Sequence, residues 1–188
     1  TAAHCVVGTK ARQLRIVGGA TTLTQNGWQA NVLKYFLMRG WGLASVNNDV
    51  CVMKLDRMLR GRNIRPIPLA STPCKAGTIV RVFGWGILSE RGTRLAETIR
   101  AVDVPIINRY KCALQYRGYA NLTKSMMCAG VPGLKDSCSS DSGGPLICGN
   151  SLYGVVSFGN GCAEIGFPGV YTKILAVKRF ILRCIRKG

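Results

Sequence analysis

The chain has 188 residues, 47% of them hydrophobic, which is enough apolar material for one domain or for two small barrels that share an interface. Its 26 Lys and Arg residues outnumber 8 Asp and Glu residues and give a net charge of +18. No apolar run approaches the roughly 20 residues that a membrane-spanning helix needs, so we expect no membrane span. Nine cysteines in so short a chain indicate an oxidising compartment.

Runs of β-branched and apolar residues predict short strands along most of the chain. In chain order these strands cover residues 13–17, 29–36, 50–55, 78–83, 101–107, 146–148, 152–157 and 170–174. Residues 108–115 predict a short helix capped by Asn108. The tail, residues 176–186, has its apolar residues at helical spacing and its basic residues mostly on the other face. Short strands with glycine-rich turns predict an all-β fold of antiparallel barrels.

The positive charge favours anionic partners such as heparin-like glycans, nucleic acid or acidic membranes. The basic residues are nevertheless spread from Lys10 to Lys187, with the densest cluster at the C-terminus. We therefore interpret the charge mainly as a source of solubility and non-specific adhesion, and we expect only weak binding of polyanions.

Three polar segments are candidates for chemistry. The first, Thr1-Ala2-Ala3-His4-Cys5, contains the only histidine of the chain. The second places Asp49 at the start of an apolar strand, and the third, residues 136–146, surrounds Ser142 with two acids, further serines and two glycines. A serine hydroxyl is a weak nucleophile until a base takes its proton. The third segment alone therefore indicates only a polar turn, whereas the order His, Asp, Ser supplies a base and a carboxylate.

The segments TAAHC, NNDVCVMKL and DSCSSDSGGPL, with residues 157–159 and 168–171, resemble the chymotrypsin-like serine proteases, trypsin branch, over the whole chain. The resemblance implies two antiparallel Greek-key β-barrels and a C-terminal helix. It implies that the first barrel is incomplete, because the family places its first strands before the His motif. Residues 1–70 would be the remainder of the first barrel, 71–175 the second barrel and 176–188 the helix. The complete parent would be a secreted zymogen.

By the same resemblance, Ser142 attacks the substrate carbonyl, His4 takes its proton and Asp49 orients His4. The backbone N–H groups of Ser140 and Ser142 would form the oxyanion hole. The family has glycine at the position of Ser140, and glycine reaches positive φ at lower cost than serine. The predicted activity is therefore that of a serine endopeptidase whose oxyanion hole depends on how Ser140 is held.

Asp136 matches the acid at the base of the trypsin pocket, where it would bind the cation of a substrate Arg or Lys. The expected partners are proteins and peptides with Arg or Lys before the cut, together with protease inhibitors. Further residues match positions around the substrate or its supports: Ser137, Ser157, Gly159, Gly169 and a nearby tyrosine, Tyr116. Among these, Ser157 matches a position that supports Asp49.

The family's acid at Asp141 pairs with a free amino terminus made by activation ahead of the His motif. We therefore expect the chain as given to be inactive or nearly so, and the activity to belong to its complete parent. Residues 15–19, Arg-Ile-Val-Gly-Gly, read like an activation site but follow His4, so we interpret them as a strand and a glycine turn. The alternative function is a non-catalytic homologue that acts as a basic secreted binding protein. Ser140 and the charge favour that alternative, whereas the complete triad favours the enzyme.

The cysteines fall into two groups. Cys112–Cys128 and Cys138–Cys162 match two family disulfides. The pairing of the others cannot be read from the sequence, although Cys74–Cys184 is one arrangement that would tie a loop to the tail helix. Residues 6–48 contain no Asp or Glu, which argues against a calcium loop, and C-x-x-C pairs for a zinc site are missing. We predict no metal site and no cofactor.

Overall fold

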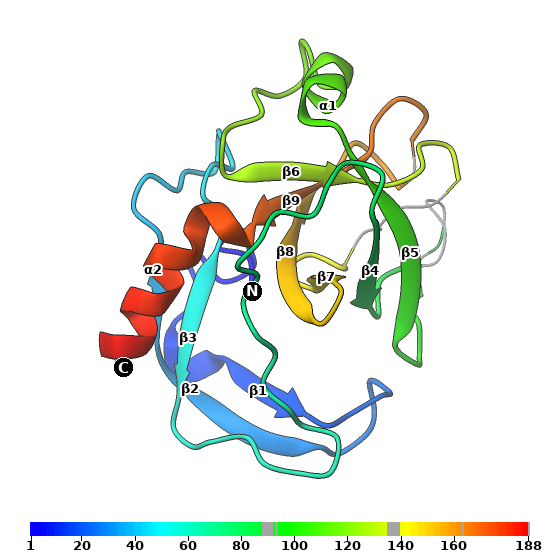
Figure 1. The fold of residues 1–188 in the computed structure, drawn as a ribbon. Coiled ribbons are helices and arrows are strands. Elements are labelled where there is room, and N and C mark those ends of the chain that lie inside the picture. Colours follow the sequence, from blue (N-terminus) through cyan, green and yellow to red (C-terminus); the bar gives the residue numbers. More distant parts are fainter. Residues whose placement is uncertain (88–91, 93, 135–139, 163, 188) are drawn as a thin grey trace.

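The computed structural model describes residues 1–87, 92, 94–134, 140–162 and 164–187. Its strands form two sheets, and a helix at the C-terminal end packs beside them (Figure 1). In chain order the elements are η1 (Ala11–Gln13), β1 (Arg15–Gly18), β2 (Trp28–Leu37), β3 (Cys51–Leu55), β4 (Ile79–Gly84), β5 (Arg100–Ile107), α1 (Arg109–Gln115), β6 (Met126–Ala129), β7 (Pro145–Cys148), β8 (Ser151–Phe158), β9 (Gly169–Lys173) and α2 (Ile174–Lys187).

The second sheet closes into a barrel with the strand order β4-β5-β6-β9-β8-β7, and every neighbouring pair is antiparallel. Successive side chains of a strand point to opposite faces, so alternate residues of β4 enter the interior. Val80 and Val82 meet Leu146 and Tyr171 there in the largest buried cluster. Each such side chain contributes roughly 1.5–3 kcal/mol by leaving water.

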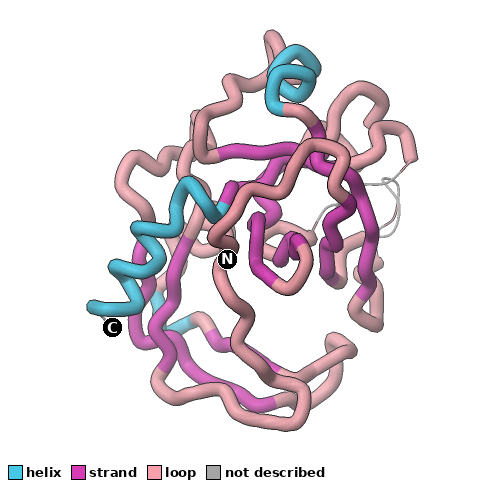
Figure 2. The backbone as a smooth tube through the Cα atoms, viewed as in Figure 1, coloured by secondary structure: helices cyan, strands magenta, loops and turns pink. Residues whose placement is uncertain are grey.

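The first sheet has the order β1-β2-β3. Strand β2 is long and shifts register between Val32 and Lys34, where a bulge bends it. Figure 2 shows β1 and β2 of this sheet below the barrel, and one long segment, residues 56–78, leads from β3 to the barrel. The expected all-β fold with a C-terminal helix is confirmed: the second barrel is closed, and in place of the first barrel the described residues form an open three-stranded sheet, which fits the expected remainder of that barrel. The domain boundaries at residues 70 and 175 stay predictions.

Helix α2 packs where the two sheets meet. Its Val177 and Ile181 belong to one buried cluster with Val50, which precedes β3, and Val155 of the barrel. Lys178 Nζ donates to the carbonyl oxygens of residues 69 and 70, at 3.5 and 2.8 Å. Within the described residues, neither helix is both long and apolar enough to cross a membrane.

The local predictions fail in two places. No strand was predicted at β6, because four residues bounded by Ser125 and Gly130 give too short a run to show alternation. The tail helix begins at Ile174, which we expected to end the preceding strand. Ile174 is completely buried, and its burial suits either structure.

The pairing of Cys74 was left open by the sequence, and the arrangement considered there, Cys74–Cys184, is not the one formed, because Cys74 pairs with Cys148. The Cys74 N–H donates to Tyr153 Oη at 3.0 Å, which fixes the loop beside the barrel, and Cys148 ends β7 nearby. Cys184 lies on α2 as a buried free thiol. Tertiary packing brings Cys74 to β7 and not to the helix.

Candidate active site

The centre of the candidate site is a contact between His4 and Asp49. The His4 ring Nδ1 lies 2.7 Å from Asp49 Oδ2, and the His4 backbone N–H donates to Asp49 Oδ1 at 3.0 Å. Ala2 and Ala3 are completely buried, so these small residues let the turn that carries His4 pack tightly. Asp49 is also completely buried, whereas the His4 side chain keeps 27% of its surface exposed. The imidazole thus has one edge against a carboxylate and one edge toward solvent.

Two hydroxyl groups from the barrel hold Asp49 in place. Ser157 Oγ of β8 donates to Asp49 Oδ2 at 2.6 Å, and Thr172 Oγ1 of β9 donates to the Asp49 backbone oxygen at 2.7 Å. Asp49 precedes β3 of the first sheet, so these bonds join the two sheets at the site. A buried carboxylate is costly unless it is hydrogen-bonded, and these donors offset that cost.

The two titrating groups shift in opposite directions. Burial by itself raises the pKa of Asp49, but the hydrogen bonds from His4 and Ser157 outweigh it and leave that pKa below the ordinary value. The hydrogen bond to Asp49, and then the contact with Cys5, raise the pKa of His4 to about 10. The pair therefore favours imidazolium beside carboxylate at neutral pH.

The loop that carries Ser142 lies against the segment that carries His4. A Cβ added to Gly143 would collide with Thr1 Oγ1 and lie 3.4 Å from Cys5 Sγ, and Gly143 has a φ of +81°. Ser142 itself is exposed. Among the described residues, the hydrogen-bond partner of His4 Nε2 is Cys5 Sγ, at 3.6 Å, and not Ser142 Oγ.

Ser140 has a φ of +73°, in the left-handed region that favours glycine. A non-glycine residue adopts this backbone at a cost of roughly 1–2 kcal/mol. The next residue, Asp141, accepts a hydrogen bond from the Gly86 N–H at 2.8 Å. A Cβ on either Gly84 or Gly86 would collide with the Asp141 carboxylate, so both glycines are needed where that side chain lies. The loop from residue 140 to residue 144 thus contacts the His4 segment through Gly143 and the segment after β4 through Asp141.

Comparison with known proteins identifies the family of this chain. The family model "Trypsin" matches residues 1–181. The chain belongs to the trypsin family. It is 37% identical to Seminase of Drosophila melanogaster over 187 residues, covering 99% of this chain and 68% of that protein. It is 38% identical to Trypsin zeta of the same species over 191 residues, which cover 96% of this chain and 68% of that protein. It is 35% identical to Trypsin delta of the same species over 184 residues, which cover 97% of this chain and 72% of that protein. The predicted family is therefore confirmed.

The structure describes only some of the residues that we expected to line the substrate pocket. Asp136, Ser137 and Cys138 lie outside the described residues. Gly159 is exposed just after β8, and a Cβ there would lie 3.4 Å from the Gly161 backbone oxygen; Gly169 is buried at the start of β9. The pocket assignment stays a prediction.

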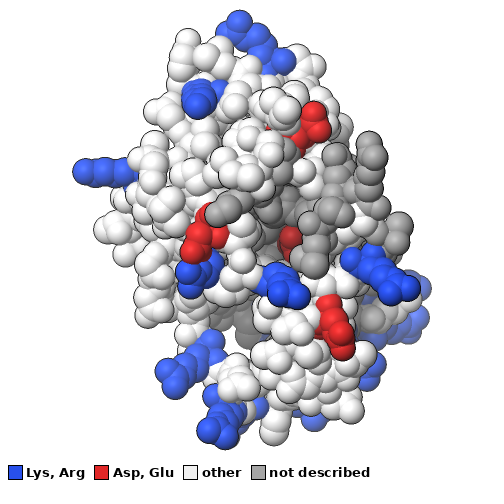
Figure 3. All heavy atoms as spheres, turned by 90° about the vertical axis from the view of Figure 1, so that its right-hand side faces the viewer, with Lys and Arg blue, Asp and Glu red and all other residues white. Residues whose placement is uncertain are grey.

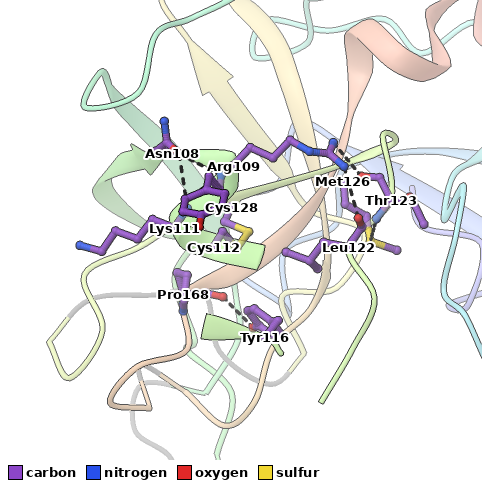
Figure 4. The surroundings of a disulfide bond; sticks show 11 residues. Asn108, Arg109, Lys111, Cys112, Tyr116, Leu122, Thr123, Met126, Cys128 and Pro168 are labelled. Atoms are coloured by element: carbon purple, nitrogen blue, oxygen red, sulfur yellow. Dashed lines mark hydrogen bonds between the residues drawn. A yellow bond between two sulfur atoms is a disulfide. The ribbon is translucent and has the colours of Figure 1, made fainter. Parts of the chain in front are cut away.

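Figure 4 shows the packing around Tyr116, next to the disulfide between Cys112 and Cys128. Tyr116 is completely buried, and its hydroxyl donates to the Pro168 backbone oxygen at 2.7 Å. Its ring contacts those of Phe158 and Phe167 edge-on. Helix α1, which ends before Tyr116, is capped by the Asn108 side chain as predicted.

The expected Cys112–Cys128 disulfide is present and ties α1 to β6 (Figure 4). Cys162 is disulfide-bonded, but its expected partner, Cys138, lies outside the described residues, so that pairing stays a prediction. Cys5, Cys51 and Cys184 are free thiols in this structure.

Three residues of the site were not found by sequence reasoning. Thr172 is one of many threonines in strands, and only the fold brings it to Asp49. Gly84 and Gly86 flank a tryptophan, and a Gly-Trp-Gly segment after a strand is a usable signal of close backbone approach.

The strand predicted at residues 13–17 is present as β1, Arg15–Gly18. The segment that reads like an activation site is therefore part of the first sheet.

Proposed function

We propose that the chain is the catalytic part of a secreted serine endopeptidase that cleaves peptide bonds after Arg and Lys. The observation that carries this proposal is the buried Asp49 carboxylate, with His4 Nδ1 at 2.7 Å and Ser157 Oγ at 2.6 Å. A carboxylate in this position holds a proton on Nδ1 and leaves Nε2 for the nucleophile. The names of the trypsin relatives support the same class of reaction.

In the proposed mechanism, Ser142 Oγ attacks the substrate carbonyl carbon while Nε2 of the neutral His4 ring takes the hydroxyl proton. The contact with Cys5 is one of the interactions that raise the pKa of His4, so loss of that contact favours the neutral ring. The protonated His4 then gives this proton to the leaving amine, and the C–N bond breaks to leave an acyl group on Ser142. Water repeats the sequence to release the acid. The contact between Cys5 Sγ and His4 Nε2 has to give way before Ser142 can use the same nitrogen.

The developing oxyanion would be held by the backbone N–H groups of Ser140 and Ser142. The positive φ of Ser140 supports this role, because it is the backbone that the family reaches with glycine. Removing one donor of this kind typically lowers the rate roughly 100- to 1000-fold. Specificity for Arg and Lys would come from Asp136, whose carboxylate pairs with the substrate cation.

The test uses the complete, activated protein. A fluorophosphonate should label Ser142, as located by peptide mass spectrometry, and Ser142→Ala should lower kcat roughly 10⁶-fold while the protein stays folded. On peptides that differ only before the cut, kcat/KM should be high for Arg and Lys and low for Phe and Leu. Asp136→Ser should remove that preference.

Two results would contradict parts of this proposal. A wild-type preference for aromatic residues would overturn the pocket assignment while keeping the triad. An activated protein that neither reacts with the fluorophosphonate nor cleaves any peptide would support the alternative, a non-catalytic homologue that acts as a binding protein.

A further inference from the structure

The loop between α1 and β6 contains a short pattern that the proposed reaction does not use. It reads Asn121-Leu122-Thr123, and nowhere else in the sequence is an asparagine followed two positions later by serine or threonine. Neither Leu122 nor the next residue, Lys124, is proline. This pattern is the acceptor for N-linked glycans on surface loops of secreted proteins. It is short enough to occur by chance, so the structure around it has to show whether the asparagine can carry a sugar.

The three residues of the pattern differ in burial. Asn121 is exposed, whereas Leu122 and Thr123 are partly buried. Leu122 packs against the buried cluster that contains Cys112 and Met126. Its neighbours thus hold the loop against the protein while Asn121 stays open to solvent. A bulky, hydrated group on Asn121 would therefore displace nothing in the core.

Arg109, in the first turn of α1, fixes the backbone of this loop. Its guanidinium donates to the backbone oxygen of Thr123 at 3.1 Å and to that of Leu122 at 3.3 Å, as Figure 4 shows. The disulfide between Cys112 and Cys128 joins the same helix to β6, which follows the loop. A group attached to Asn121 would therefore leave the protein from a defined position.

The Thr123 side chain connects the loop to the candidate active site. Its Oγ1 donates to Asn47 Oδ1 at 2.7 Å, and Ser125 Oγ donates to the same oxygen at 2.9 Å. Asn47 lies two residues before Asp49, whose carboxylate contacts His4. Asn121 lies two residues before Thr123, which is at most about 7 Å along the chain. A sugar on Asn121 would thus stand beside the segment that leads to Asp49.

The surface at this end of the molecule has few charges. Figure 3 shows a face whose Lys and Arg side chains lie mostly in its lower part, while its upper part, at the level of α1 and β6 in Figure 1, is mostly uncharged apart from a few cations. Tyr110 of α1 is 73% exposed, and Tyr119, which follows α1, is 55% exposed. The hydroxyl groups of a sugar would add hydrogen-bonding surface in this region.

We propose that Asn121 carries an N-linked glycan. In this step Asn121 Nδ2 forms a bond to the anomeric carbon of a sugar, the bond from that carbon to a lipid-linked pyrophosphate breaks, and the amide loses one proton. The disulfides indicate an oxidising compartment, as such a modification requires. Thr123 then has two roles, as part of the acceptor pattern and, after folding, as the donor to Asn47. The inference rests on the secreted location proposed above and does not depend on catalysis.

The experiment uses the complete protein, produced in cultured insect cells because the relatives include Drosophila proteins. Wild type, Asn121→Gln, Thr123→Ser and Thr123→Val are collected from the medium and treated with a peptide N-glycosidase in heavy-oxygen water, which marks the asparagine that held the sugar. Peptide mass spectrometry should find the mark at position 121 in the wild type and in Thr123→Ser, which keeps the acceptor pattern. Asn121→Gln and Thr123→Val should carry no sugar at this position.

Thermal unfolding separates the two roles of Thr123. Asn121→Gln and Thr123→Val both lack the sugar, but only Thr123→Val also lacks the hydroxyl that bonds to Asn47. Its unfolding midpoint should therefore be lower than that of Asn121→Gln by about 2–4 °C, the shift that loss of one hydrogen bond typically causes in a chain of this size. Equal midpoints would overturn the second role of Thr123.

The glycan and the proposed peptidase can fail separately. A folded wild-type protein in the medium with an unmodified Asn121 would overturn the glycan and leave the proposed peptidase untouched. A wild-type protein that stays in the cytosol would contradict the secreted location, and with it both proposals. If Thr123→Val does not fold, the comparison of wild type with Asn121→Gln still decides whether position 121 carries the sugar.

Discussion

The hydroxyl of Ser157 offers the sharpest test of how the site is held together. It donates a 2.6 Å hydrogen bond to Asp49, a carboxylate with no exposed surface, and Ser157 itself is only 3% exposed. Hydrogen bonds to charged groups contribute about 1.5–3 kcal/mol, against about 0.5–1.5 kcal/mol for neutral partners. Ser157→Ala should therefore lower the free energy of unfolding by about 2 kcal/mol.

Thr172 provides the matched control. Its hydroxyl also donates to Asp49, at 2.7 Å, but to the neutral backbone oxygen. Thr172→Val keeps the shape of the side chain and should cost about 1 kcal/mol. Urea unfolding at pH 7 measures both variants, with m-values compared to check that the unfolding reaction is unchanged.

The pH dependence adds a second check. The pKa of Asp49 is lowered in the folded protein, so its contribution to stability is present above its unfolded value of 3.8 and is lost as the pH falls through the folded pKa. Ser157→Ala moves the folded pKa of Asp49 toward 3.8. The difference in free energy of unfolding between the variant and the wild type should therefore be largest at neutral pH and become smaller below about pH 4. A loss at pH 7 under about 0.5 kcal/mol, or a larger loss for Thr172→Val, would refute this account.

Three further predictions follow from the same geometry. His4 is the only histidine, so its NMR titration is unambiguous, and its midpoint should lie near pH 10, falling in Cys5→Ala; a wild-type midpoint near 6.5 would contradict the contacts. Because folding raises this pKa, His4 adds stability below about pH 6.5 that is lost as the pH rises through about 10, as urea unfolding across that range should show. Ser140→Gly should raise the free energy of unfolding by up to about 1 kcal/mol, because glycine adopts the positive φ at lower cost, whereas Ser140→Ala should not raise it. Equal effects of the two substitutions would exclude backbone strain at this position. Asn108→Ala should cost about 1 kcal/mol in urea unfolding through loss of the α1 cap, and no change would mean that water replaces the cap.

The sequence by itself determined the features that depend on short segments. The strand and helix periods placed most elements within two residues, because alternate burial along a strand needs only local information. The Asn108 cap is equally local, since its acceptor reaches N–H groups two and three residues on. The three polar segments indicated the family, and their order supplied the catalytic residues that we propose.

Only the tertiary structure decided which distant residues meet. The partner of Cys74 could not be read from the sequence because a disulfide depends on where two distant segments lie, and barrel packing brings Cys148 to it. The hydroxyls on Asp49 come from positions more than a hundred residues away, on strands whose neighbours are set by barrel closure. The register of β2 and β3 is likewise decided by the tertiary structure: it buries Val32 opposite Leu55, and a shift of one residue would send either side chain to the other face of the sheet.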